Sequence, residues 1–295
     1  MEFAIFGRLT QTTDFRALDV FFQFLQQQHI VAKVYDEYAE ELQAVDYQWS
    51  GEFFRQQFSK MGEVETADFF FSLGGDGTLL DAIRYTVKAN LPVVGVNFGR
   101  LGFLTSSSQE DLVEVCKGLM QGAYRIDRRA MIEVDSQPRY NFGGHNYGLN
   151  EVTIHKATSN EMIVIHTFIN GEFLNTFWAD GLIISSPTGS TAYNLASGGP
   201  IIMPGSDVFV ITPIAPHSLT VRPFIIPDDA VVSFEIESRS GNALVAVDSR
   251  TELVESNIEL AVRRAKTNAR LVRVNAPSYF STLRQRLNWG FDVRN

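Results

Sequence analysis

The spacing of apolar residues along the chain changes near residue 125. Before that point, short apolar runs alternate with segments in which apolar residues recur every three or four positions. The apolar runs are 3–7, 31–35, 69–73 and 92–97. They predict strands, of which 92–97, apolar throughout, is expected to be covered on both faces. The periodic segments predict amphipathic helices, the first of which Asp14 opens. Strands alternating with helices predict a doubly wound α/β layer.

Beyond residue 125 the chain consists mostly of short β-type runs separated by turn residues. These runs are 130–134, 147–155, 162–169, 172–177, 181–185, 208–213, 231–237 and 243–247. Asn170-Gly171 between two of them predicts a tight hairpin. One short helix is indicated at about 190–196, and residues 279–287 have a helical pattern. We therefore predict a β-rich region of the sandwich type.

These patterns divide the chain into two domains. A chain of 295 residues is long enough for two separate cores. We predict an α/β domain over 1–126 and a β-rich domain over 127–277. The C-terminal helix within 278–295 is expected to pack back on the first domain.

One segment, 36–66, has no clear pattern. It is acidic and rich in glutamine, with possible helical pieces around Phe53-Phe54 and Phe58. We interpret it as a solvated face.

Composition limits the classes of function. With 45% hydrophobic and 20% charged residues, the chain resembles an ordinary soluble globular protein. A net charge of -9 argues against nucleic acid or an anionic membrane as the main partner. The single cysteine, Cys116, excludes an intrachain disulfide and a cysteine-based metal cluster. The N-terminus has no basic lead or long apolar core, so we predict a cytoplasmic protein.

The first candidate site is the turn Gly74-Gly75-Asp76-Gly77-Thr78, between an apolar run and a helical pattern. A strand-to-helix turn of this kind presents free N–H groups and the positive end of a helix, which attract phosphate. It lacks the Lys-Ser/Thr ending of a P-loop and the G-x-G-x-x-G pattern. A carboxylate beside phosphate can accept a proton from an attacking hydroxyl or hold Mg²⁺ through water, and both roles belong to phosphoryl transfer. The alternative is that Asp76 only caps the helix.

The second candidate site is the stretch from Asp180 to Pro200. An apolar strand leads into a loop rich in hydroxyl groups, then a short helix and Gly-Gly-Pro. The hydroxyls of segment 185–191 exceed what one helix cap requires. Such a loop can bind ribose hydroxyls or phosphate, with Tyr193 as a stacking face.

The third candidate is the pair Asn150-Glu151. Adjacent residues on a strand point to opposite faces, so both reach one ligand only at a strand end or a bulge. Taken alone, such a pair is more often a surface feature.

Together these three groups resemble the motifs of the NAD kinase family. The matching segments are 74–78, 97–104, 149–151, 180–200, 216–219 and 222–223. The glycine–aspartate turn is shared with diacylglycerol-type lipid kinases and, more loosely, with phosphofructokinases. Segment 188–194 is what separates NAD kinases from them.

The resemblance implies a transferase that moves the γ-phosphoryl group of ATP to the 2′-hydroxyl of the adenosine ribose of NAD, as in NADP biosynthesis. It implies Asp76 as the general base and a phosphate site at Gly74, Gly75, Gly77 and Thr78. The NAD site that it implies consists of Asp76, Gly77, Phe103, Asn150, Glu151, Asp180, Thr188, Thr191, Ala192, Tyr193, Asn194, Leu195, Ala196 and Ala215. It also implies a divalent cation, by default Mg²⁺, whose protein ligands stay unassigned, and a homodimer or homotetramer.

Two departures from the family pattern affect this interpretation. Asp248-Ser249-Arg250 stands where members often carry Asp-Gly-Gln, so Arg250 could reach a phosphate. Glu161 stands in a region where a basic side chain often helps. Two alternative functions stay open: a lipid or small-alcohol kinase that shares the glycine turn, and a non-catalytic module that senses NAD(P). Polyphosphate also stays open as the phosphoryl donor.

Overall fold

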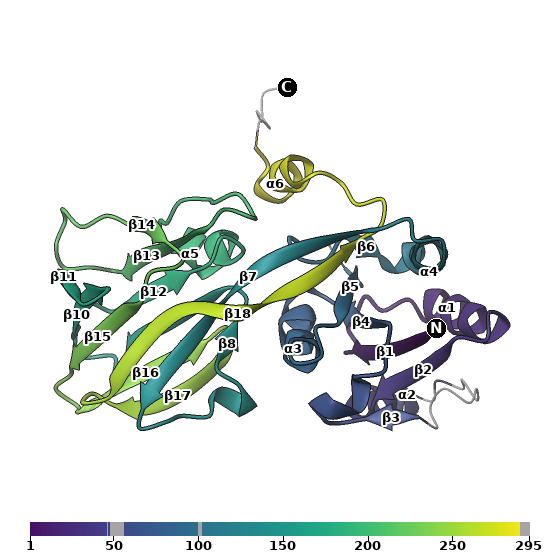
Figure 1. Cartoon of the computed structure of the whole chain (residues 1–295), viewed down its shortest axis with the longest axis horizontal. Coiled ribbons are helices and arrows are strands. Elements are labelled where there is room, and N and C mark those ends of the chain that lie inside the picture. The colour runs from purple at the N-terminus through teal and green to yellow at the C-terminus, as the bar shows by residue number, and fades with distance from the viewer. Residues whose placement is uncertain (46, 48–55, 100–101, 290–295) are drawn as a thin grey trace. The chain divides into compact units, whose positions relative to one another are not determined.

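The computed structural model describes residues 1–45, 47, 56–99 and 102–289 (Figure 1). The helical pieces predicted around Phe53-Phe54 lie outside these residues. Within the described part, no helix is both long and apolar enough to cross a membrane. The chain forms two compact units: unit 1 comprises 1–128 and 269–295, and unit 2 comprises 129–268.

Unit 1 is built on a parallel sheet with the strand order β5-β4-β1-β2-β3. Its strands are β1 (Glu2–Gly7), β2 (Val31–Tyr35), β3 (Gln57–Phe58), β4 (Phe69–Gly74), β5 (Pro92–Asn97) and β6 (Ser107–Ser108). Both β6 and the last residues of β18 (Glu259–Arg273) pair with β5. The helices are α1 (Phe15–Gln27), α2 (Asp36–Ala44), α3 (Asp76–Thr86), α4 (Leu112–Met120) and α6 (Tyr279–Leu287), with 3-10 turns η2 (Met61–Val64) and η3 (Gln109–Asp111).

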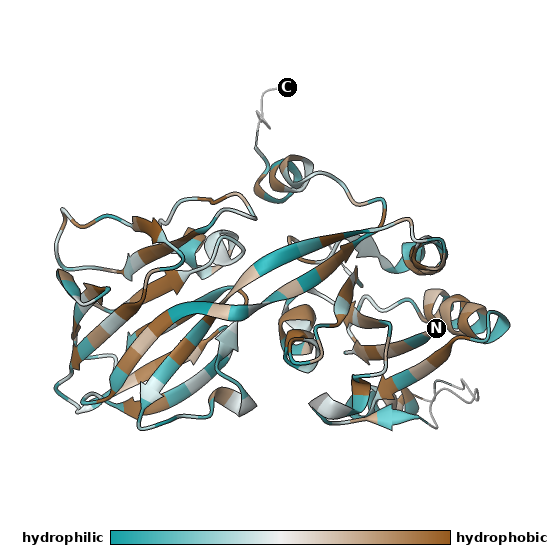
Figure 2. Ribbon diagram, in the orientation of Figure 1, coloured by the Kyte–Doolittle hydropathy of each residue, from teal (hydrophilic) through white to brown (hydrophobic). Residues whose placement is uncertain are grey.

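The apolar strands of unit 1 form its core, as their sequence predicts. Phe3 of β1 pairs with Phe69 of β4, and Phe70 pairs with Val93 of β5. Figure 2 shows these strands in largely hydrophobic colours. Helix α1 begins after Asp14, whose carboxylate accepts the Arg16 N–H at 2.9 Å. The doubly wound α/β prediction is confirmed.

The prediction of a solvated face for 36–66 is wrong for much of its described part. Tyr38, Ala39 and Leu42 of α2 are fully buried, as is nearly all of Phe58. A Cβ atom on Gly7 would lie 2.7 Å from the Tyr38 ring, so α2 packs directly on β1. Acidic residues on the opposite side of α2 had concealed this short apolar face.

Unit 2 contains two antiparallel sheets. One has the order β14-β13-β12-β9-β16-β17; the other contains β11-β10-β15-β18, with β7 beside β18 and β8 beside β7. The strands are β7 (Arg125–Gln137), β8 (Tyr147–Gly148), β9 (Glu151–Lys156), β10 (Ile163–Ile169), β11 (Glu172–Ala179), β12 (Gly181–Ser185), β13 (Val208–Ile214), β14 (Phe224–Pro227), β15 (Val232–Glu237), β16 (Asn242–Val247) and β17 (Arg250–Glu255). Short helical turns are η4 (Phe142–Gly144), η5 (Gly189–Thr191) and α5 (Tyr193–Ala196).

The two sheets of unit 2 share one apolar core. Ile154 of β9 and Leu182 of β12 belong to the same buried cluster as Ile165 of β10 and Phe234 of β15. The β10–β11 turn has positive φ at both Asn170 and Gly171 (52° and 83°), as a two-residue hairpin turn requires. The predicted β-rich sandwich is therefore confirmed.

Candidate active site

The glycine turn joins β4 to α3. β4 ends at Gly74, Gly75 occupies the N-cap position, and Asp76 is the first residue of α3. A Cβ atom on Gly75 or Gly77 would meet no described atom within 4 Å, so both present open backbone. Thr78 is buried, and its hydroxyl accepts the Gly75 N–H at 3.4 Å. Open glycines at the start of an 11-residue helix suit the approach of an anionic group.

Both oxygens of the Asp76 carboxylate accept hydrogen bonds from the segment 103–105. Oδ1 accepts the Leu104 N–H at 3.2 Å, the Thr105 N–H at 3.0 Å and the Thr105 hydroxyl at 2.9 Å. Oδ2 accepts the Phe103 N–H at 2.7 Å and shares the Leu104 N–H at 3.2 Å. Asp76 therefore does not cap α3 with its side chain, and instead orders a loop distant in sequence.

Asn97 and Thr105 support this loop from inside. Asn97 Nδ2 donates to the Thr105 hydroxyl at 3.0 Å, and the Gly102 N–H donates to the same oxygen at 3.1 Å. Asn97 Oδ1 accepts the Gly99 N–H at 2.7 Å. A Cβ atom on Gly102 would overlap the Asp76 carboxylate, which explains the need for glycine there.

Two arginines from the C-terminal part of unit 1 reach the same loop. Arg273, which is 9% exposed, donates to the Leu104 carbonyl at 2.9 Å and pairs with Asp127 at 3.2 Å. The Arg286 guanidinium lies 5.9 Å from the centre of the Phe103 ring, a cation–π distance. Sequence analysis missed both because they lie far from every motif.

In unit 2, the Asn150-Glu151 corner is held by a carboxylate that the sequence did not single out as a site residue. Asp248, in the β16–β17 turn, accepts the N–H groups of Leu149 at 2.8 Å, Asn150 at 2.8 Å and Glu151 at 3.2 Å. From the other side, the Ser186 N–H donates to the Asn150 carbonyl at 2.9 Å. The corner sits at the start of β9, so both predicted side chains lie at a strand end.

Glu151 is a buried acid. It is 8% exposed, and its Oε2 atom has no hydrogen-bond partner among the described residues. Burial, together with the charge of Asp248, raises the pKa of the Glu151 carboxyl to about 8. Burial also raises the pKa of Asp248, although the N–H groups of Leu149 and Asn150 and the charge of Arg250 oppose that shift. Glu151 therefore carries a proton at neutral pH.

This proton predicts a pH dependence of stability. Folded Glu151 keeps its proton up to about pH 8, whereas an unfolded glutamate releases it near pH 4.5. The folded state binds more protons between these values, so stability falls as pH rises across that window. Glu151→Gln removes this contribution. The melting temperature of the variant minus that of the wild type should therefore increase as the pH is raised from about 5 to about 9. Glu235→Gln, at an exposed position of β15, is the control, and an equal offset at both pH values would contradict the prediction.

The loop after β12 uses three of its hydroxyls internally. Ser185, Ser186 and Ser190 are fully buried and donate to backbone carbonyls. The Thr188 hydroxyl accepts a bond from Arg129 of β7 at 3.2 Å, and Thr191 donates to the Thr188 carbonyl at 3.3 Å. Most of the hydroxyl enrichment therefore shapes the loop, while the half-buried Thr191 stays at its surface.

The side chain of Asn194 is used within the fold, and a ligand contact of this residue stays a prediction. Its side chain is fully buried, and Nδ2 donates to the carbonyls of Ser190 at 3.1 Å and Pro200 at 3.0 Å. Its Oδ1 accepts the Thr212 hydroxyl at 2.6 Å. Asn194 therefore fixes the loop against β13.

Arg250 also has a structural explanation. Its guanidinium donates to the carbonyls of Phe142 at 2.9 Å and His145 at 2.7 Å, and also to that of Tyr147. These bonds tie β17 to the segment before β8. The phosphate contact expected of Arg250 stays a prediction beside this positioning role.

A second group of candidate residues lies at the other end of β9 and β12. Tyr193 is 39% exposed, and its ring stacks on His155 with centroids 5.8 Å apart. Burial lowers the pKa of His155, an effect that the charge of Asp180 opposes. Asp180 itself pairs with Lys156 at 2.6 Å. His155 and Lys156 contact these candidates, and the motifs did not indicate them.

The strand register sets the distance between the two groups in unit 2. Glu151 pairs with Ser185 and His155 pairs with Gly181. Four residues of strand correspond to about 13 Å, a span that suits an extended dinucleotide.

The other residues predicted for the NAD site lie on the loops around these two groups. Ala192 and Leu195 are half-buried, whereas Ala196 and Ala215 are exposed. Ala215 adopts a positive φ of 44°.

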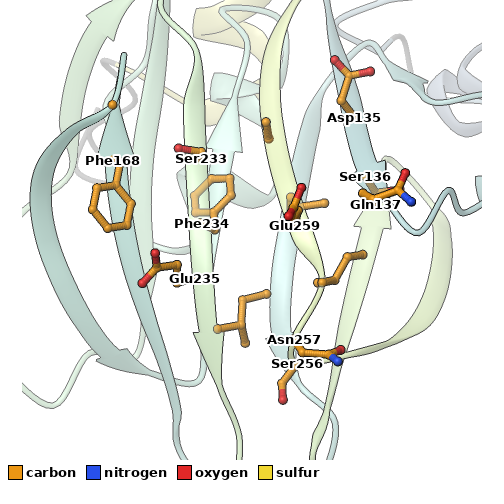
Figure 3. Close-up of a pocket in the computed structure, with 15 residues that line it drawn as sticks. Asp135, Ser136, Gln137, Phe168, Ser233, Phe234, Glu235, Ser256, Asn257 and Glu259 are labelled. Carbon is orange, nitrogen blue, oxygen red and sulfur yellow. The ribbon is translucent and has the colours of Figure 1, made fainter.

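A groove of about 750 Å³ in unit 2 lies among other residues (Figure 3). Phe168 and Phe234 line it, together with the carboxylates of Asp135, Glu235 and Glu259. Asp135 is paired with Arg263 at 2.7 Å, but Glu235 and Glu259 would repel a phosphate-bearing ligand, and the residues that line the groove include no lysine or arginine. We therefore do not assign the nucleotide site to this groove.

The chain matches two families of known domains. Residues 6–124 match the ATP-NAD kinase N-terminal domain and residues 149–274 the ATP-NAD kinase C-terminal domain. It is 45% identical to the NAD kinase of Cytophaga hutchinsonii over 238 residues, 81% of each chain, and 34% identical to that of Flavobacterium psychrophilum over an alignment of 297 residues that covers both fully.

Solved structures have the same fold. Yeast NADH kinase complexed with NADH has a TM-score of 0.84 at 23% identity, covering 99% of this chain and 89% of that one. An NAD kinase from Archaeoglobus fulgidus in complex with ATP has a TM-score of 0.72 at 22% identity, covering 98% and 99%. With both of its domains and its full-length relatives in agreement, the chain belongs to the ATP-NAD kinase family.

Proposed function

We propose that the protein is an NAD kinase that transfers the γ-phosphoryl group of ATP to the 2′-hydroxyl of the adenosine ribose of NAD. The observation that carries this proposal is an ordered carboxylate, Asp76, at the open N-terminal end of α3. Membership of the family supplies the identity of the substrates. Besides ordering the loop, a carboxylate in this position can take part in the chemistry, a role that offsets its repulsion of phosphate.

In the proposed reaction, Asp76 accepts the proton of the ribose hydroxyl as that oxygen attacks the γ-phosphorus. General-base assistance contributes about 10²–10⁴-fold to rate. The backbone of Gly75 and Gly77 meets the phosphates of ATP. The remaining catalysis comes from positioning and charge neutralisation.

The charges of unit 2 support an anionic dinucleotide as ligand. Glu151 is protonated at neutral pH, and Asp180 is neutralised by Lys156. Asp248 faces three backbone N–H groups. Little negative charge is therefore left to repel the pyrophosphate of NAD. Tyr193, stacked on His155, offers an aromatic face to a base or ribose.

Further properties follow from the same proposal. We propose that Mg²⁺ enters with ATP as part of the substrate. We also propose that the enzyme is cytoplasmic and a homodimer or homotetramer, as the family resemblance implies.

The direct test is NADP formation by the purified protein with NAD, ATP and Mg²⁺. We expect one NADP and one ADP per turnover, with no phosphorylation of diacylglycerol in parallel reactions. Polyphosphate in place of ATP tests the donor. Tight NAD binding by calorimetry without release of ADP would support a sensing module instead, and activity on lipid alone would reject the proposal.

A further inference from the structure

The two oxygens of the Asp76 carboxylate have different surroundings. Oδ1 accepts three donors, two of them from Thr105 at 3.0 and 2.9 Å. Oδ2 accepts one short bond, from Phe103 at 2.7 Å, and shares the Leu104 N–H with Oδ1 at 3.2 Å. Each carboxylate oxygen has about two lone-pair positions, so the two Thr105 donors occupy those of Oδ1, whereas Oδ2, with one short bond and one shared bond, is the less occupied oxygen.

We propose that Thr105 is a positioning residue for the catalytic carboxylate, anchoring Oδ1 so that Oδ2 faces the substrate hydroxyl. This inference rests on the proposed function. In the step it describes, the proton of the 2′-hydroxyl moves to Oδ2 and the ribose oxygen bonds to the γ-phosphorus. The bond from that phosphorus to the β–γ bridging oxygen breaks, and its electron pair leaves with ADP.

The hydroxyl of Thr105 is oriented by its neighbours. Its Oγ1 accepts Asn97 Nδ2 at 3.0 Å and the Gly102 N–H at 3.1 Å. With both lone pairs occupied, its hydrogen is left to point at Asp76 Oδ1. Thr105 is 2% exposed, so water does not compete for these bonds. The result is a chain of hydrogen bonds with a fixed direction, which runs from Asn97 through Thr105 to Oδ1 of Asp76.

Removing the Thr105 hydroxyl tests whether this chain of hydrogen bonds positions the carboxylate. Thr105→Val keeps the N–H bond and the side-chain shape but loses the hydroxyl donor, so Oδ1 is held less firmly. We expect kcat for NADP formation to fall by about tenfold or more, because small misplacements of reacting groups are costly, while KM for NAD changes by less than about threefold. Thr105→Ser restores the donor and should recover kcat to within about threefold of wild type.

Thr86→Val is the matched control. Thr86 is also buried in unit 1, and its hydroxyl donates to the Ile83 carbonyl at 2.9 Å, within α3 and away from Asp76. It should cost stability without a comparable fall in kcat. If Thr105→Val does not fold, Asn97→Ala takes its place, because it removes the donor to the Thr105 hydroxyl.

The outcomes are distinguishable. The role of Thr105 is overturned if Thr105→Val and Thr86→Val have equal kcat values. It is also overturned if Thr105→Ser is as slow as Thr105→Val. If Asn97→Ala has to replace Thr105→Val, an unchanged kcat in that variant overturns the role. A folded wild-type protein that makes no NADP rejects the proposed function itself.

Discussion

Asp76→Asn should lower kcat for NADP formation by about 10²–10⁴-fold, the usual contribution of a general base. The asparagine side chain lacks the basic carboxylate oxygen that would accept the proton. Its carbonyl can keep the Oδ1 position, where Leu104 and Thr105 donate. Its NH₂ group then faces the Phe103 N–H, which donated to Oδ2 at 2.7 Å. The substitution therefore removes the proton acceptor and places two hydrogen-bond donors next to each other. Most of the hydrogen bonds that hold the loop remain.

Initial rates of NADP formation at saturating NAD and ATP measure this effect, with thermal melting to verify the fold. Asp81→Asn provides the same chemical change on the same helix. Asp81 pairs with Arg8 at 3.0 Å at the surface, and such pairs contribute little, so its activity should stay within about twofold of wild type. Turnover by a folded Asp76→Asn enzyme close to that of Asp81→Asn would remove Asp76 as the base.

Gly189→Ala is the second large effect that the structure predicts. Gly189 is buried, and a Cβ atom there would lie 2.7 Å from the Asn150 Cα and closer still to its carbonyl group. The obstacle is backbone that Asp248 and Ser186 hold in place, so it cannot move aside cheaply. We expect a loss of stability of about 1–3 kcal/mol and NAD binding weakened by about tenfold or more, because the Asn150-Glu151 corner shifts.

Calorimetric titration with NAD and urea unfolding measure the two effects. Gly62→Ala is the control, since a Cβ atom there would approach only the end of the Glu65 side chain, at 3.9 Å. It should leave NAD affinity unchanged. A folded Gly189→Ala protein with wild-type affinity would show that the corner does not carry the dinucleotide.

The sequence predicted those parts of the fold in which local pattern and burial agree. Strands such as β4 and β5 are apolar throughout, because they are covered on both faces. It missed β18, the long strand Glu259–Arg273, because charged residues interrupt its alternation. Two of these, Arg263 and Arg264, are paired with carboxylates of Asp135 and Asp228, contacts that only the folded chain provides.

The same division applies to the candidate site. Asp76 and Glu151 were recognisable because they lie inside contiguous motifs. Thr105 and Asp248 act on them across 29 and 97 positions of sequence, so no local pattern could connect them. Asn194 lies inside a motif, yet its side-chain amide is used within the fold, a role that its local pattern does not indicate.

The path of the chain determines when, during synthesis, the contacts around the loop that holds Asp76 can form. Unit 1 consists of two stretches of chain separated by the whole of unit 2. During synthesis β1 to β5 emerge first, whereas the end of β18 emerges only after unit 2. Until then, the Leu104 carbonyl lacks its bond from Arg273, and β5 lacks its pairing with β18. The last contacts around the loop that holds Asp76 therefore form only after the whole of unit 2 has been made.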